Sequence, residues 1–209
     1  PRVVDNTRPI KHLTYDEAAE LAYFGAKILH PSSITPTKNS NIPVRLKSTL
    51  DPDSDGTLIS SKTNSKGLKA IAAKDNIIAI KIKSGRMLLA YGFLRKVFEI
   101  FELYRTSIDM ITTSEVAVSV TIDDDTNVKE IEKELLKYGT VEIDREQTIV
   151  SVVGEFLEQD KGVASRILEC LKGVSIRMIS YGGSNHNISF LINTNDKKEA
   201  LVKLNALFN

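Results

Sequence analysis

The sequence lacks the features that mark several large classes of protein. It holds a single cysteine, Cys170, so no internal disulfide can form. The 28 lysines and arginines nearly balance the 27 aspartates and glutamates, which leaves no net basic field to attract a nucleic acid. The longest apolar runs, such as 77–80, are far shorter than the ~20 residues that cross a bilayer. We therefore expect a cytoplasmic protein that binds neither nucleic acid nor membrane.

Clusters of catalytic or metal-binding residues are also missing. Histidine and cysteine do not occur at the spacing of zinc ligands, so no metal site is predicted. His30 has no carboxylate and nucleophile near it in the pattern of a catalytic triad, and we interpret it as structural. Cys170 lies on a helical pattern with Ile167 and Leu171, which favours burial as a small apolar residue. Hydrophobic residues (42%) and charged residues (26%) occur as in globular proteins, and the length fits one or two domains.

The N-terminal part of the chain predicts an α/β fragment. Thr14 and Glu17 are spaced as a capping box, in which two side chains satisfy free amides at a helix start. Pro31 suits the first turn of a second helix, and residues 43–46 predict a short strand. No strand precedes these elements, which suggests that the sequence opens in the middle of a domain. Since residues 51–66 are polar and rich in turn formers, we place the domain boundary there.

An internal repeat follows this boundary, and its first copy has the order strand, helix, strand, strand, helix, strand. Apolar and polar residues alternate over 78–83 and again over 116–122, which predicts half-buried strands. A helix begins at Gly92, a strand follows at 108–111, and residues 140–147 close the copy. The apolar faces expected for the two helices consist of Leu94, Val97, Phe98 and Phe101 in the first and of Val128, Ile131 and Leu135 in the second.

The second copy begins at 149–153 and continues through a strand at 188–192 to a terminal helix at 197–208. It ends on that helix, so its last strand must come from elsewhere in the chain. The short apolar segment 68–72 is left over before the first copy and fits this place. We therefore expect an arrangement in which the first module is inserted within the second.

The two copies align most clearly in the strand after their first helix. Segments 107–111 and 175–179 differ at one position, where Asp109 of the first copy is replaced by Arg177 in the second. An ammonium group gains charge-assisted hydrogen bonds from a carboxylate and is repelled by a guanidinium. We therefore predict that only the first module binds an amino acid through this position.

Four segments together resemble the aspartate kinases: Phe-Gly-Ala-Lys-Ile-Leu-His-Pro (24–31), Gly-Phe-Leu (92–94), Ile-Thr-Thr-Ser-Glu (111–115) and Ser-Asn-His-Asn (184–187). The resemblance covers the whole chain. It implies the C-terminal portion of an amino-acid-kinase domain at 1–62, a first ACT module at 77–147, and a second ACT module made of 67–76 and 148–209. The expected fold class is an α/β kinase remnant followed by tandem α+β ACT modules of the ferredoxin-like βαββαβ type, with the first inserted in the second.

The resemblance is closest to the lysine-inhibited, monofunctional type. It implies a regulatory region that binds a feedback inhibitor, L-lysine or another amino acid of the aspartate family, and that forms a homodimer through its ACT modules. The whole enzyme of this family uses ATP and Mg²⁺ to convert L-aspartate to 4-phospho-L-aspartate, the first step of lysine, threonine and methionine biosynthesis. Because most of the catalytic domain is missing, we predict no catalytic residue, no cofactor and no activity for this chain alone.

The resemblance also assigns binding residues. Arg2 and Lys27 match family positions near the ATP phosphates, and the alternative is that they are two surface cations. The effector site is assigned to Met87, Gly92, Phe93, Leu94, Asp109, Ser114, Glu115 and Val116.

The residue types of this effector site suit a free amino acid. Backbone N–H groups of 92–94, at a helix start, match its carboxylate. Asp109 can accept hydrogen bonds from its ammonium, and Glu115 can select a cationic side chain. The alternative is that both acids are solvated charges at strand ends. Segment 184–187 is either a contact between ACT modules, as the family implies, or a plain hairpin turn.

Two other functions compete with a regulatory region of an enzyme. A stand-alone ACT module for amino-acid binding or assembly would have no reason to carry the α/β segment 1–62. An RNA-binding domain has a similar order of elements, but the sequence lacks the basic, aromatic strand motif that such binding uses.

Overall fold

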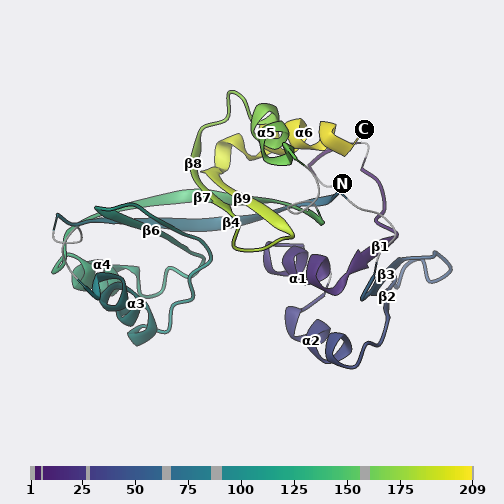
Figure 1. Cartoon of the computed structure of the whole chain (residues 1–209), viewed down its shortest axis with the longest axis horizontal. Helices are drawn as coiled ribbons and strands as arrows, with labels where there is room; N and C mark the ends of the chain where they lie inside the picture. The colour runs from purple at the N-terminus through teal and green to yellow at the C-terminus, as the bar shows by residue number, and fades with distance from the viewer. Residues whose placement is uncertain are drawn as a thin grey trace.

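The computed structural model describes residues 3–5, 7–26, 29–62, 67–85, 91–155 and 161–208. A small three-stranded sheet and two helices form the N-terminal segment at the right of Figure 1. Its strands lie in the order β1-β3-β2, with β3 parallel to β1 and antiparallel to β2. The elements are β1 (His12–Thr14), α1 (Tyr15–Tyr23), α2 (Pro31–Asn39), β2 (Val44–Leu46) and β3 (Thr57–Ser60).

Local sequence accounts for the two helix starts of this segment. The Thr14 side chain accepts a hydrogen bond from the Glu17 amide at 3.1 Å, and the Glu17 carboxylate accepts one from the Thr14 amide at 2.8 Å. The predicted capping box is therefore present. His30 caps α2, because its Nδ1 accepts a hydrogen bond from the Ser32 amide. Pro31 follows in the first turn, where its missing amide hydrogen costs nothing.

The rest of the chain forms one six-stranded sheet in the order β5-β6-β4-β7-β9-β8. Every pairing in it between neighbouring strands is antiparallel. The strands are β4 (Gly67–Lys83), β5 (Ile111–Thr113), β6 (Ala117–Ile122), β7 (Thr140–Glu155), β8 (Ile176–Tyr181) and β9 (Asn187–Asn193). The helices are α3 (Phe93–Leu103), α4 (Val128–Leu135), α5 (Val163–Cys170), α6 (Lys197–Asn205) and the short 3₁₀ turns η2 (Thr194–Asp196) and η3 (Ala206–Phe208).

Two long strands are shared between the modules. Residues 67–74 of β4 pair with 149–155 of β7, whereas 77–83 pair with 140–147. Asn76 and Glu146, where the strands pass from one module to the other, have positive φ angles of 60° and 55°. The leftover segment 68–72 therefore completes the second module, which confirms that the first module is inserted in it.

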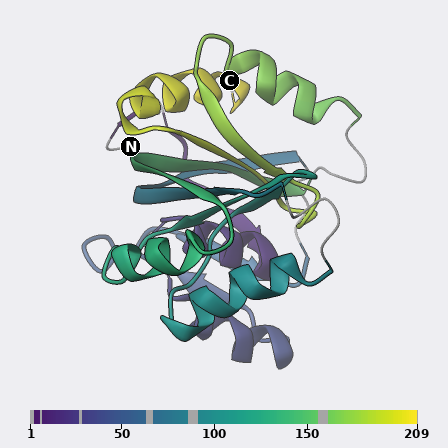
Figure 2. The ribbon, with the colours of Figure 1, turned by 90° about the vertical axis from the view of Figure 1, so that its left-hand side faces the viewer.

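The helices of the two modules cover opposite faces of the sheet. Figure 2 shows α3 and α4 below the sheet and α5 and α6 above it. The first module buries Ile80, Ile82, Val97 and Phe101, and the second buries Val152, Ile167, Phe190 and Leu204. Burial of such side chains contributes about 1.5–3 kcal/mol each, so each module has its own core.

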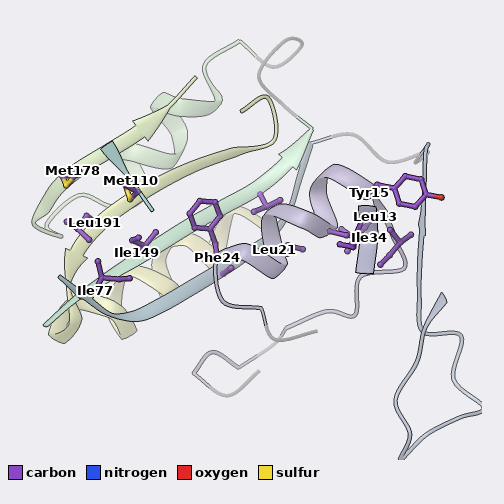
Figure 3. Close-up of a cluster of buried hydrophobic side chains, with 14 of the residues drawn as sticks. Leu13, Tyr15, Leu21, Phe24, Ile34, Ile77, Met110, Ile149, Met178 and Leu191 are labelled. Atoms are coloured by element: carbon purple, nitrogen blue, oxygen red, sulfur yellow. The ribbon is translucent and has the colours of Figure 1, made fainter. Parts of the chain in front are cut away.

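Helix α1 covers the face of the second module that α5 and α6 leave open. Leu21 of this helix and Phe24, its C-cap residue, join a cluster with Ile149 and Leu191 of the sheet, as Figure 3 shows. The same cluster extends into the N-terminal segment through Leu13. One continuous core therefore joins that segment to the sheet.

Four local expectations need correction. The turn-rich segment 51–66, where the domain boundary was placed, contains a strand, because Thr57–Ser60 forms β3 and Ile59 is fully buried between β1 and β2. The strand expected at 108–111 is assigned to Ile111–Thr113. Leu94 is 38% exposed, and Phe93 takes its place in the core of α3. Cys170 is only partly buried, at the edge of the second core.

No helix within the described ranges combines the length and the apolar character needed to cross a membrane. Likewise, no group of three or more histidine, cysteine, aspartate or glutamate side chains in those ranges is placed to hold a metal ion.

Candidate functional site

The start of α3 has no side-chain cap among the described residues. Gly92, the residue before the helix, is left-handed, with φ of 82°. The amides of the first turn therefore lack a partner within the helix and carry the positive end of its dipole. Phe93 anchors this turn in the core, while Leu94 is partly exposed. Met87 lies outside the described residues.

The turn between β5 and β6 lies at the same end of the first module. The Ser114 amide donates to the Ala117 carbonyl at 2.8 Å, and the Ser84 amide donates to the Val116 carbonyl at 2.9 Å. The second bond ties the turn to the end of β4, from which the chain leads to Gly92. Ser114, Glu115 and Val116 are all exposed.

Asp109 is a buried carboxylate at the opposite end of β5. Its side chain is 3% exposed, and its Oδ1 accepts a hydrogen bond from Lys74 Nζ at 2.8 Å. Its Oδ2 is buried and has no hydrogen-bond partner among the described residues. An unmatched buried acceptor costs about 1–3 kcal/mol, more when it is charged, so this oxygen calls for a donor.

Lys74 connects Asp109 to two further groups. Its ammonium lies 2.8 Å from Asp123 Oδ2 and 5.5 Å from the centre of the Tyr23 ring. Lys74 comes from the part of β4 that belongs to the second module, and Tyr23 comes from α1. The cluster of Lys74, Asp109 and Asp123 thus joins both modules and the N-terminal segment.

Burial and ion pairing shift the pKa values of Asp109 and Lys74 in this cluster. Burial raises the pKa of Asp109, and the hydrogen bond from Lys74 only partly opposes that effect. Burial also lowers the pKa of Lys74, but hydrogen bonds to Asp109 and Asp123 outweigh it and leave the pKa raised. Lys74 therefore stays charged, while two carboxylates share one cation.

The predicted residues therefore fall into two groups within one chain. β4 and β5 both pair antiparallel with β6, so they run parallel, and α3 leads from the end of β4 back to the start of β5. Gly92 and the 114–116 turn lie at one end of β5, and Asp109 lies at the other. At ~3.3 Å per residue, the strand separates Asp109 from Ser114 by roughly 15 Å, farther than one amino acid reaches.

The second module has a different charge at the equivalent place. Arg177 pairs with Asp144, and their side chains are 40% and 37% exposed. Arg177 and Lys81 line a hollow of about 210 Å³, so two cations face it. Each of these cations has an acidic partner, Asp144 for Arg177 and Glu142 for Lys81. The equivalent place therefore presents a guanidinium where the first module presents the Asp109 carboxylate.

Comparison with known proteins places the chain in a family. Residues 150–208 match the ACT domain, and residues 1–48 match the amino acid kinase family. A structure named as a C-terminal regulatory domain of aspartate kinase from Porphyromonas gingivalis W83 is 50% identical, with a TM-score of 0.62, and the match covers 67% of this chain and 97% of that one. The chain belongs to the aspartate kinase family.

Longer aspartate kinases match the whole chain. Aspartokinase 3 of Arabidopsis thaliana, a chloroplastic protein, is 37% identical over 100% of this chain and 39% of its own length. The lysine-sensitive aspartokinase 3 of Escherichia coli K12 is 37% identical over 99% of this chain and 48% of its own. The chain thus spans less than half of these curated relatives.

Two structures of E. coli aspartokinase III also match. The complex with aspartate and ADP has a TM-score of 0.92, at 37% identity, over 100% of this chain and 49% of that one. The complex with lysine and aspartate has a TM-score of 0.87, at 37% identity, over 99% and 48%. The fold predicted from the resemblance, a kinase remnant followed by tandem ACT modules, is confirmed.

The kinase segment of this aspartate kinase chain holds the loop 184–187 of the second ACT module. Glu20 of α1 accepts hydrogen bonds from Ser184 Oγ at 2.6 Å and from Asn187 Nδ2. Within this chain, then, the loop is more than a hairpin turn and contacts the kinase segment. The two predicted nucleotide-binding residues, Arg2 and Lys27, lie outside the described residues.

Sequence reasoning missed three residues around Asp109: Lys74, Asp123 and Tyr23. Lys74 precedes Asp75 and Asn76, a polar run that suggests a turn, although β4 continues through it. The internal repeat could have identified Lys74. It lies two residues before Asn76 in β4, and another charged residue, Asp144, lies two residues before Glu146 in β7.

Proposed function

We propose that this chain is the regulatory region of an aspartate kinase and that its first ACT module binds L-lysine as a feedback inhibitor. The observation that carries the proposal is the buried Asp109 carboxylate, whose Oδ2 has no partner among the described residues. The ammonium of an amino acid supplies the donor and the positive charge that this cluster needs. Arg177 at the equivalent place of the second module has no acceptor to offer an ammonium.

The remaining predicted residues suit the other groups of lysine. The free amides at the start of α3, at Gly92, Phe93 and Leu94, favour a carboxylate. The exposed Ser114, Glu115 and Val116 offer an acidic side chain and backbone groups to the ammonium of the lysine side chain. Met87 completes the proposed set by family resemblance.

A second copy of the chain brings the two groups together. Among the strands that the structure describes, β5 lies at the edge of the sheet beside β6, and its three residues are exposed. If two copies pair antiparallel through β5, centred on Ile111 and Thr112, then Asp109 of one copy lies opposite Ser114 of the other. A homodimer through the first ACT module therefore forms two equivalent effector sites.

The relatives support lysine as the effector and aspartate phosphorylation as the regulated reaction. E. coli aspartokinase III binds lysine and aspartate in one structure and aspartate and ADP in another. By this analogy, the whole enzyme uses ATP and Mg²⁺ to make 4-phospho-L-aspartate in the cytoplasm. The core shared by α1 and the second module supports regulation of the kinase segment over a stand-alone binding module.

Titration calorimetry with L-lysine tests the proposal. The wild-type chain should bind, and Asp109→Asn should weaken binding roughly tenfold or more, since ~1.4 kcal/mol corresponds to one decade. Arg177→Gln is the matched control and should bind lysine normally. Normal binding by Asp109→Asn, or loss of binding in Arg177→Gln, would mean that the effector belongs to the other module. Titrations with threonine and methionine test the choice of lysine.

A further inference from the structure

We propose that the side-chain ammonium of Lys74 competes with the effector's ammonium for the Asp109 carboxylate. When the effector binds, Lys74 moves away from Asp109, and this movement changes its contact with Tyr23 of the kinase segment. The inference rests on the proposed function. It adds a mechanism in which Lys74 pairs with Asp109 before the effector binds and moves when the effector arrives. Lys74 occupies the Oδ1 of the carboxylate that we assign to the effector's ammonium.

Asp109 keeps its place without Lys74. Its amide donates to the Thr121 carbonyl at 2.9 Å, and the next amide, of Met110, donates to Thr121 Oγ1 at 2.9 Å. The Thr121 amide returns a hydrogen bond to the Met110 carbonyl at 3.0 Å. The backbone around the carboxylate is therefore fixed by β6, and the lysine side chain is bound to a site that already exists.

Two ammonium groups on one buried carboxylate repel each other, so an arriving effector weakens the bond from Lys74. Lys74 has an alternative partner, because Asp123 Oδ2 already lies 2.8 Å from its ammonium. Asp123 is 43% exposed, against 3% for Asp109, and so carries a smaller desolvation cost. The displaced ammonium therefore moves from Asp109 towards Asp123.

The kinase segment lies close enough to sense this move. The Lys74 ammonium is 5.5 Å from the centre of the Tyr23 ring, within the range of a cation–π contact. The chain after Tyr23 packs on the backbone of the same strand. A Cβ at Gly25 would lie 2.4 Å from the Ala73 carbonyl oxygen and 3.4 Å from Lys74 Cα. A shift of the lysine side chain therefore changes the surroundings of the last turn of α1.

The competition is tested by whether Lys74→Gln strengthens lysine binding and Asp123→Asn weakens it. By calorimetry at pH 8, Lys74→Gln should bind L-lysine about fivefold to tenfold more tightly than the wild type, because the competitor is gone. Lys74→Arg retains a cation and should bind within about twofold of the wild type. Lys83→Gln removes a lysine of the same strand that pairs with Glu142, and it should not change the affinity.

Asp123→Asn should have the opposite effect and weaken lysine binding severalfold, because the displaced ammonium loses its second partner. Its control is Asp125→Asn, which removes a nearby carboxylate that is 74% exposed and lies 3.8 Å from Arg145. The Tyr23 ring signals in an NMR titration of the tyrosine-labelled chain should shift with lysine in the wild type. They should not shift in Lys74→Gln.

The outcomes separate this inference from the proposed function. A wild-type chain that binds lysine, with binding weakened by Asp109→Asn, supports the function. If Lys74→Gln then binds lysine more weakly than the wild type, Lys74 only positions the carboxylate and the competition is disproved. If Lys74→Gln does not fold, an unchanged affinity in Asp123→Asn disproves it instead. If the wild type binds neither lysine nor threonine nor methionine, both proposals fail.

Discussion

Lys74 and Asp144 occupy equivalent positions in the two modules and carry opposite charges. Each lies shortly before the residue of positive φ at which its strand passes into the other module, Asn76 for β4 and Glu146 for β7. Lys74 pairs with Asp109 and Asp144 pairs with Arg177, so the repeat contains the same ion pair twice with reversed polarity. The reversal leaves a buried carboxylate in one module and an exposed guanidinium in the other.

The first prediction concerns the pH dependence of stability at Asp109. Burial raises the pKa of this carboxyl group, so its contribution to folding is greatest below the usual carboxyl pKa and is lost as the pH rises through the raised value. Asp109→Asn removes that loss. The free energy of unfolding of the variant, relative to the wild type, should therefore increase between about pH 3 and pH 7. Urea denaturation over this range measures it, and a decrease would contradict the assignment.

Asp75 should behave in the opposite way. Burial acts to raise its pKa, but hydrogen bonds from Lys197 at 2.6 Å and Thr148 at 2.9 Å outweigh burial and lower it. Its contribution is present above the usual carboxyl pKa and is lost as the pH falls through the lowered value. Asp75→Asn should therefore destabilise the chain at neutral pH and have little effect in acid. The same urea series checks this, and equal effects at both ends would contradict it.

A buried and an exposed residue of α3 test which face of the helix packs in the core. Phe101 is 2% exposed and Leu103 is 70% exposed. Phe101→Ala should lower the free energy of unfolding by about 3–5 kcal/mol, because it leaves a cavity in the first module. Leu103→Ala, the control in the same helix, should change it by less than about 0.5 kcal/mol. Chemical denaturation compares the two, and similar losses would contradict the assigned face of the helix.

The pairing of the long strands depends on Gly154. A Cβ there would lie 2.3 Å from the Gly67 carbonyl oxygen and 2.8 Å from Leu68 Cα. Gly154→Ala should therefore force β4 and β7 apart and cost about 1–3 kcal/mol. Gly183→Ala is the control, since no atom lies within 4 Å of its added Cβ. Thermal unfolding measures both, and a Gly154→Ala variant as stable as the wild type would disprove the close approach.

Periodicity and repeats predicted the sheet and its helices well, because amphipathic patterns are local. Val128, Ile131 and Leu135 were predicted to form one helix face, and all three are buried. The segment 68–72 could be assigned because the second copy lacked a strand. β3 was missed because Thr57–Ser60 contains only two apolar residues among turn formers, and its burial depends on β1 and β2.

The candidate site was harder to predict, because charge pairing depends on tertiary placement. Asp109 was identified from the difference between the repeats, but its partner Lys74 lies on a strand of the other module. The roughly 15 Å between Asp109 and Ser114 follows from the direction of β5, which no single segment reveals. The contact of Glu20 with Ser184 joins opposite ends of the chain and leaves no sequence signal.

The exchange of strands between the modules also sets an order of folding. The first module closes over one continuous stretch of chain, whereas the second needs Gly67 to meet Glu155 across that whole stretch. Closing a longer loop costs more entropy, and distant pairings form more slowly. The first module should therefore fold early. Its paired parts of β4 and β7 then bring together the parts of the same strands beyond Asn76 and Glu146, which belong to the second module. Helix α1 packs on the sheet of the second module, so the N-terminal segment should dock only after that module has formed.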